Sequence, residues 1–401
     1  MRTIKNFINL FFLIIGHLSP RSCRKIVFGA WDGKSYSDNP KFLFEYLFDH
    51  PEWKIVWIGC KEEKESLPPL PAHASFAVRH TLKGLWHALT AKTWVFSHCP
   101  NDIALVAIYG RALLIDTCHG VALKKVGLQS VSQKRTRSSF DWFWKMIFAR
   151  KAFLVMPSNI QGKNTLASYP KLFHEPILPF GSTSLDYIIN NATNESLIQK
   201  LRTKYATIFN LPLDKKWIIY APTFRLSKTE NFSFQNLESP EKEKIHDRLQ
   251  AINAIIIEKL HPSLITNDIK KNNNEIYSIS GDKGRLIDPQ ELWLAADALI
   301  SDYSSCVIPF YLQKKPVIHF AYDYDFYTKS DSGLIEDLVN IRFGAIVYTV
   351  DELCNMLCDL SMAVDQCGEL APSLIEYEKG TACERCATFI KAQLFQNNNQ
   401  A

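Results

Sequence analysis

The sequence predicts an α/β protein of two doubly wound domains that face a cleft. Its 401 residues exceed what one ordinary core accommodates, and 47% of them are apolar, as in globular proteins. Short apolar runs alternate with mixed, helix-like stretches in two successive series. Because the runs are almost continuously apolar rather than alternating, they indicate buried parallel strands, and two series indicate two sheets.

Each series supplies several expected strands. In the first they span 25–30, 54–59, 93–97, 112–117 and 152–157. In the second they span 217–221, 254–258, 298–301, 316–320 and 345–348. The segments 39–49 and 81–90 are expected crossover helices. Because a polar, helix-like stretch separates the series, we expect domains at 23–195 and 196–401, preceded by a leader at 1–22.

The leader is basic and apolar. Residues 1–25 contain five basic residues and no acid, which equals the formal net charge of +5. The apolar run 4–15 is shorter than the roughly 20 residues of a membrane-spanning helix. Phe7, Phe11, Ile14 and Leu18 fall on one helical stripe, which predicts an amphipathic helix on an anionic membrane surface. Burial of that stripe against the protein's own core is the alternative.

A second basic stretch runs from Lys124 to Lys151, with bulky aromatic residues at 140–144. The combination is typical of a bilayer interface, although core packing explains the aromatic residues equally well. Nucleic acid is not expected as a partner, because no recognition motif accompanies the charge.

The ten cysteines show no framework spacing, which indicates a reducing compartment. Cys383 and Cys386 form one CxxC, but no second pair with metal spacing follows. We therefore expect these two cysteines on a helix face rather than in a structural zinc site, and we assign no metal-ligating residues.

A histidine follows the expected strand at 112–117, at the edge where open α/β sheets bind ligands. His119 carries an imidazole, and the pKa of an unperturbed imidazole, near 6.5, suits proton abstraction. Asp116 is placed to orient His119, and Gly120 is expected to contact the substrate. A structural turn histidine is the alternative.

Polar residues also follow strands of the second series. After 217–221, Thr223 offers a hydroxyl and Arg225 a planar fork suited to phosphate. After 254–258, His261 is positioned to donate to a pyrophosphate oxygen, with a capped turn as the alternative.

The segment after 298–301 is the fourth such loop. Either Ser304 or Ser305 is expected at a helix N-cap, where free N–H groups and hydroxyls favour a phosphate. Ordinary helix capping is the alternative. Asp302 is expected to bind a ribose or acceptor hydroxyl, or to act as a cap.

Together the four loops resemble the CDP-glycerol glycerophosphotransferase family of teichoic-acid primases and polymerases, over roughly residues 25–360. The matching elements are His119-Gly120 with Leu123-Lys124-Lys125-Val126-Gly127, Ala221-Pro222-Thr223-Phe224-Arg225, Lys259-x-His261-Pro262, Ser301-Asp302-Tyr303-Ser304-Ser305, and Pro316-Val317 with Ala321-Tyr322-Asp323 and Phe326-Tyr327. Cys118 stands where the family often has Trp, and Pro309 where it often has an acidic residue.

The resemblance implies a GT-B-like fold of two Rossmann-like domains, with a CDP-alcohol held mainly by the second. It implies that His119 is the general base on the acceptor hydroxyl. It further implies that Arg225, His261, Ser304 and Ser305 hold the pyrophosphate.

The predicted function is transfer of glycerol phosphate, or a related polyol phosphate, from a CDP-activated donor such as CDP-glycerol, with release of CMP. The acceptor is a hydroxyl of a lipid-linked saccharide or of a growing teichoic-acid-like or capsular polymer. The enzyme is expected as a peripheral protein at the cytoplasmic face of the bacterial cell membrane. A divalent cation is left open as a cofactor, and no oligomeric state is predicted. The alternatives are a GT-B glycosyltransferase that uses a nucleotide sugar and a catalytically inactive membrane-surface binding protein.

Overall fold

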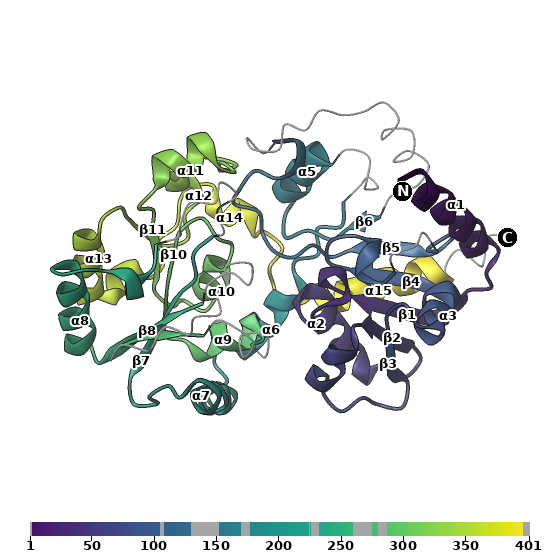
Figure 1. The fold of residues 1–401 in the computed structure, drawn as a ribbon, viewed down its shortest axis with the longest axis horizontal. Helices are drawn as coiled ribbons and strands as arrows, with labels where there is room; N and C mark the ends of the chain where they lie inside the picture. Colours follow the sequence, from purple (N-terminus) through teal and green to yellow (C-terminus); the bar gives the residue numbers. More distant parts are fainter. Residues whose placement is uncertain are drawn as a thin grey trace. The chain divides into compact units, whose positions relative to one another are not determined.

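The computed structural model describes residues 2–104, 108–129, 152–169, 177–223, 225, 232–259, 275–279 and 287–395, with only the backbone for 2–9 and 128. The chain forms two compact units, and each contains a six-stranded sheet with helices on both faces (Figure 1). The first unit comprises Met1–Gly120, Arg135–Tyr187 and Ile375–Ala401, and the second comprises Val121–Lys134 and Ile188–Leu374.

The first sheet is parallel, with the strand order β3-β2-β1-β4-β5-β6 of dinucleotide-binding Rossmann domains. Its strands are β1 (Ser22–Gly29), β2 (Lys54–Gly59), β3 (Ala74–Val78), β4 (Ala91–Phe96), β5 (Leu113–Asp116) and β6 (Phe153–Leu154). Of these, only β3 was not predicted. The strand order reverses between β1 and β4, so the loops after these strands flank the usual ligand crevice.

Helices bury both faces of this sheet. One face packs against α2 (Asp38–Tyr46) and α15 (Ala382–Phe395), and the other against α1 (Arg2–Leu18) and α3 (Leu82–Thr90). The unit also contains α5 (Asn159–Ser168) and the short 3₁₀ helices η1 (Trp31–Gly33), η2 (Leu47–Asp49), η3 (Lys61–Ser66) and η4 (Pro100–Asp102). Helix α6 (Thr183–Asn191) begins in this unit and passes into the second unit after Tyr187.

The second sheet, β12-β11-β10-β7-β8-β9, is parallel and has the same order read from its other end. Its strands are β7 (Lys216–Tyr220), β8 (Ala254–Glu258), β9 (Ile276–Ser278), β10 (Ala298–Ser301), β11 (Val317–Phe320) and β12 (Ala345–Val347). The surrounding helices are α7 (Glu195–Phe209), α8 (Glu241–Ala251), α9 (Pro289–Ala295), α10 (Val307–Leu312), α11 (Tyr324–Ser330), α12 (Leu338–Ile341), α13 (Val350–Cys358) and α14 (Ala371–Leu374), with the 3₁₀ helices η5 (Gly127–Gln129), η7 (Phe234–Asn236) and η10 (Leu360–Ala363). The strand order reverses here between β7 and β10.

The end of the chain belongs to the first unit, whereas we expected 196–401 to form one domain. The carboxylate of Asp186 accepts hydrogen bonds from the backbone N–H groups of Ala382 and Cys383, at 3.0 and 2.7 Å. Cys383 and Cys386 then lie buried on α15 against the first sheet. These contacts fasten α15 to the first unit, and the CxxC is part of its core.

The N-terminal helix α1 exposes three members of its apolar stripe. Phe11, Ile14 and Leu18 are 61%, 54% and 77% exposed, while Phe12 and Leu13 pack into the core. The side chain of Phe7 lies outside the described part of the chain. Among the described helices, none is long and apolar enough to cross a membrane.

Candidate active site

In the first unit, the loop after β5 carries His119 to the carboxyl edge of the sheet. Cys118 has a φ of 53° and Gly120 a φ of 146°, so the backbone turns on both sides of His119. The Asn39 amide donates from Nδ2 to the carbonyl oxygens of Thr117 and Cys118, at 2.8 and 3.0 Å. The loop backbone is thereby fixed, and the His119 side chain is exposed.

Asp116, the predicted orienting group, is buried at the end of β5. Its Oδ1 accepts a hydrogen bond of 2.8 Å from the backbone N–H of Cys118. Burial raises the pKa of Asp116 to about 8, and the N–H of Cys118 only partly opposes this rise. Asp116 is thus tied to the backbone one residue before His119. Its assignment as the orienting group stays a prediction.

Two aromatic side chains that sequence reasoning missed lie against His119. The rings of His98 and His119 are parallel to within 5°, with centroids 4.2 Å apart. The Trp31 ring centroid lies 4.4 Å from that of His98 and 5.9 Å from that of His119. Trp31 and His98 follow β1 and β4, where the strand order reverses. That position was the available signal, because both residues come directly after predicted strands.

Asp102 joins the loops that carry Trp31 and His98. It is completely buried. Its Oδ1 accepts a 2.8 Å hydrogen bond from the N–H of Asp32, next to Trp31. Its Oδ2 accepts from the N–H groups of Ser97 and His98, at 3.1 and 2.9 Å. A buried carboxylate with these partners ties two backbone segments together.

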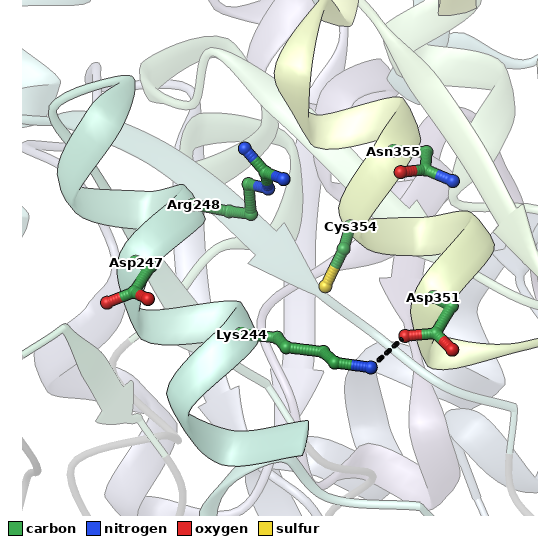
Figure 2. A pocket seen from close by; sticks show the side chains of 6 residues that line it. All are labelled: Lys244, Asp247, Arg248, Asp351, Cys354 and Asn355. Atoms are coloured by element: carbon green, nitrogen blue, oxygen red, sulfur yellow. Dashed lines mark hydrogen bonds and ion pairs between the residues drawn. The ribbon is translucent and has the colours of Figure 1, made fainter. Parts of the chain in front are cut away.

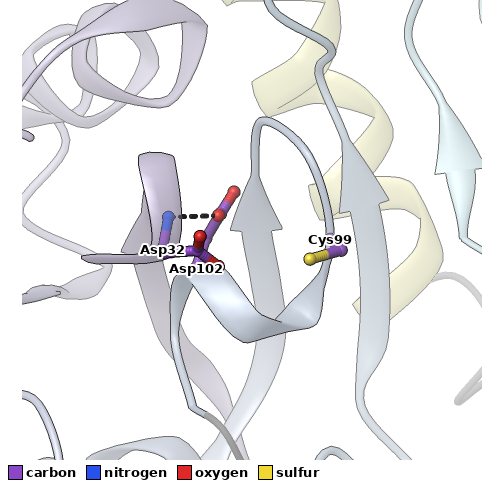
Figure 3. A group of neighbouring side chains, drawn as sticks. All are labelled: Asp32, Cys99 and Asp102. Carbon is purple, nitrogen blue, oxygen red and sulfur yellow. Dashed lines mark hydrogen bonds between the residues drawn. The ribbon is translucent and has the colours of Figure 1, made fainter. Parts of the chain in front are cut away.

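Asp32, Cys99 and Asp102 bring possible metal ligands within 4.8 Å of one another (Figure 3). However, backbone donors already engage both carboxylate oxygens of Asp102. Burial also raises the pKa of the Cys99 thiol to about 11, which disfavours the thiolate that binds metals. We therefore explain this cluster by loop stabilisation and assign no cation to it.

In the second unit, Arg225 lies buried after β7, where the strand order reverses. Its Nη2 donates to Asp302 Oδ2 and its Nε to Asp323 Oδ2, both at 2.8 Å. Its Nη1 donates to the carbonyl oxygen of Thr223 at 2.6 Å. The fork that we expected to face a phosphate therefore faces two carboxylates of the protein itself.

Three tyrosines surround the Arg225 guanidinium. The rings of Tyr303 and Tyr327 are stacked, with centroids 4.0 Å apart. The Cζ atom of Arg225 lies 4.9 Å from the Tyr327 centroid, 5.3 Å from that of Tyr303 and 5.7 Å from that of Tyr322. The cation is therefore held by aromatic faces as well as by carboxylates.

Asp302 links the loops after β7 and β10. Its Oδ1 accepts from the N–H groups of Thr223 and Tyr303, at 2.8 and 2.6 Å. The carboxylate thus binds backbone N–H groups of the protein's own loops, and its assignment to a ribose or acceptor hydroxyl stays a prediction. The buried Thr223 hydroxyl has no hydrogen-bond partner among the described residues, so it keeps its bonding capacity.

The predicted helix N-cap at Ser304 or Ser305 is wrong. Helix α10 begins at Val307, and its N-cap is Cys306. The shift has a physical reason: a helix capped at Ser304 would place Pro309 beyond the first turn, where its missing N–H breaks a hydrogen bond. With the start at Val307, Pro309 falls within the first turn. Both serines precede the helix and are half-buried at the carboxyl edge of β10.

Lys259 directly follows β8 in the second unit. Its ammonium lies 6.0 Å from the Trp293 ring centroid, and burial lowers its pKa. His261, the predicted pyrophosphate donor, lies outside the described residues. So do most of the second basic stretch and its aromatic residues at 140–144.

A surface hollow lies between α8 and α13 (Figure 2). Its lining includes Lys244, Arg248, Asp351 and Cys354, and Lys244 pairs with Asp351 at 2.6 Å. None of the predicted site residues that the structure describes lines this hollow, and we assign no ligand to it.

A model of the family described as CDP-Glycerol:Poly(glycerophosphate) glycerophosphotransferase matches residues 11–391. The chain belongs to this family. The teichoic acid glycerol-phosphate transferase of Staphylococcus aureus is 28% identical over 380 residues, which make up 91% of this chain and 92% of that protein. The teichoic acid poly(glycerol phosphate) polymerase of Staphylococcus epidermidis is 29% identical over 331 residues, which make up 79% of this chain but 43% of the polymerase.

Solved structures of the wall teichoic acid polymerase TagF have the same fold as this chain. One of them matches with a TM-score of 0.76 and 23% identity, over 98% of this chain and 95% of that one. The predicted family, the GT-B-like α/β fold and the transferase class are therefore confirmed.

Proposed function

We propose that this chain transfers glycerol phosphate, or a related polyol phosphate, from CDP-glycerol or a similar CDP-alcohol. The acceptor is a hydroxyl of a lipid-linked saccharide or of a growing teichoic-acid-like or capsular polymer. The family match over residues 11–391 carries this proposal. It is supported by the position of His119 and of Ser304 and Ser305, which follow parallel strands at ligand-binding edges.

In the proposed reaction, the acceptor oxygen bonds to the glycerol-bearing phosphorus, and the bond between that phosphorus and CMP breaks. His119 takes the acceptor proton as general base, because its exposed ring stands on a fixed loop. Ser304, Ser305 and His261 hold the pyrophosphate, and the Thr223 hydroxyl supplies a further donor. This is catalysis by positioning and charge stabilisation.

We assign Arg225 an indirect role in donor binding. Its guanidinium engages Asp302, only two residues before Ser304, and Asp323 beyond β11. These bonds support a role in fixing the loops that hold the donor, because they leave few guanidinium N–H groups to donate to a phosphate oxygen.

A donor panel tests the proposal. The purified protein is incubated with CDP-glycerol, CDP-ribitol or a UDP-sugar and a lipid-linked disaccharide analogue, and the products are identified by mass. We expect CMP and a product heavier by one or more polyol phosphate groups. Transfer of a sugar from the UDP-sugar would instead establish a glycosyltransferase, and no turnover with any donor would favour a binding protein.

We further propose that α1 holds the enzyme at an anionic membrane surface, as a peripheral protein of the cytoplasmic face. The exposed side chains of Phe11, Ile14 and Leu18 support this proposal, because a folded helix with an outward apolar stripe gains free energy at a lipid interface. A lipid-linked acceptor would be reached from that position.

A further inference from the structure

We propose that His98 is a positioning residue for the transfer reaction: its ring, braced by Trp31, holds the imidazole of His119 in the orientation for proton abstraction. The inference rests on the proposed function, since it takes His119 as the general base. The stacked rings carry it, with their planes 5° apart and their centroids separated by 4.2 Å. A flat neighbour at this distance restricts rotation of an otherwise exposed ring.

His98 is itself held from several sides. Its backbone N–H donates to the buried carboxylate of Asp102 at 2.9 Å. Its Nδ1 lies 2.7 Å from Ser97 Oγ, and Ser97 also donates to Asp102 from its backbone N–H. Both the backbone and the ring of His98 are therefore fixed, as a support for another side chain requires.

Trp31 completes the support from the loop after β1. Its φ of 50°, followed by a φ of 55° at Asp32, places two adjacent non-glycine residues in the disfavoured left-handed region. Asp102 binds the N–H of Asp32, and the Arg79 guanidinium donates to the carbonyl oxygen of Asp32. In this conformation the ring centroid of Trp31 lies 4.4 Å from the ring centroid of His98.

Charge supports the same assignment. Burial lowers the pKa of His98, while the carboxylate of Asp32 partly opposes this shift. At neutral pH an uncharged His98 does not repel the positive charge that His119 gains with the acceptor proton. A cationic side chain in its place would oppose that step.

The test compares His98→Ala with His98→Phe, which keeps a flat ring without nitrogen atoms. His50→Ala is the matched control, because His50 packs on the Tyr46 ring with centroids 5.1 Å apart and lies outside the site. We expect His98→Ala to lower kcat about 10- to 100-fold with little change in KM for CDP-glycerol, as for a misplaced catalytic group. His98→Phe should recover most of the rate, and His50→Ala should match the wild type.

Wild-type kcat in His98→Ala, or equal loss in His98→Ala and His98→Phe, would overturn the inference. A second readout does not need turnover. It measures the ring-proton NMR signals of His119, which are assigned by their loss in His119→Asn. They should shift in His98→Ala and stay nearly unchanged in His98→Phe, and an absent shift in His98→Ala would also overturn the inference. Failure of the wild type and of His50→Ala to release CMP, with the NMR shift present, would count against the proposed function instead.

Discussion

The Nη2 atom of Arg225 lies 2.8 Å from Oδ2 of Asp302, and both side chains are 1% exposed. Removing one partner of such a pair leaves an uncompensated buried charge. We therefore expect Arg225→Ala to lower the free energy of unfolding by about 3–5 kcal/mol. Denaturant unfolding followed by circular dichroism measures this loss.

The control for Arg225 is Lys329→Ala, which breaks the exposed pair with Asp325 and should cost less than about 1 kcal/mol. Similar losses of unfolding free energy in the two variants would show that the buried pair of Arg225 and Asp302 contributes no more to stability than an exposed ion pair.

Ser304 and Ser305 give the second prediction. The N-cap of α10 is Cys306, and the Ser304 hydroxyl accepts a long hydrogen bond of 3.4 Å from the N–H of Cys306. Because so long a bond is weak, replacing both serines with alanine should lower the melting temperature only slightly. Loss of hydroxyls that bind a charged phosphate should raise KM for CDP-glycerol by about tenfold or more. Steady-state kinetics and a thermal melt separate the two effects, and an unchanged KM would remove these serines from the donor site.

The raised pKa of Asp116 predicts how stability depends on pH. The folded state keeps a proton on Asp116 up to a pKa of about 8, whereas the unfolded chain releases it near pH 4. The contribution of Asp116 to unfolding free energy therefore falls as pH rises from 4 to 8. Asp116→Asn lacks this loss, so its melting temperature relative to the wild type should increase across that range.

Asp325→Asn, at an exposed carboxyl, is the control for Asp116→Asn. A difference between Asp116→Asn and the wild type that stays constant from pH 5 to 8 would mean that Asp116 is ionised in the folded protein.

The stripe of α1 predicts membrane binding. Phe11→Ser combined with Leu18→Ser should reduce co-sedimentation with vesicles of anionic phospholipid by about tenfold or more, because two large apolar side chains no longer enter the interface. Leu213→Ser removes a similarly exposed apolar side chain elsewhere and should have little effect. Equal binding by the double variant and the wild type would exclude the stripe as the contact.

The predictable part of the fold is its buried strands. β2 and β8 have the bounds expected from their continuous apolar runs at 54–59 and 254–258. The edge strands β3 and β9 were missed, because a short strand that is only partly buried needs no such run.

The site, like the fold, was predictable only where a local sequence pattern marks it. His119, Ser304 and Ser305 follow strands, so a local pattern located them. The partners of Arg225 are 77 and 98 residues away along the chain, at Asp302 and Asp323. Tertiary packing brings these two carboxylates to the guanidinium, and no local pattern contains that information. The ring stack on His98 joins loops from adjacent strands and was missed for the same reason.

The most direct test of the central claim measures CMP release from CDP-glycerol by the wild type and by His119→Asn, with the same lipid-linked acceptor. Loss of the general base should lower kcat at least about 100-fold, while calorimetry shows donor affinity within about twofold of the wild type. CMP release at the wild-type rate by a folded His119→Asn protein would contradict the assignment of His119 and the mechanism built on it.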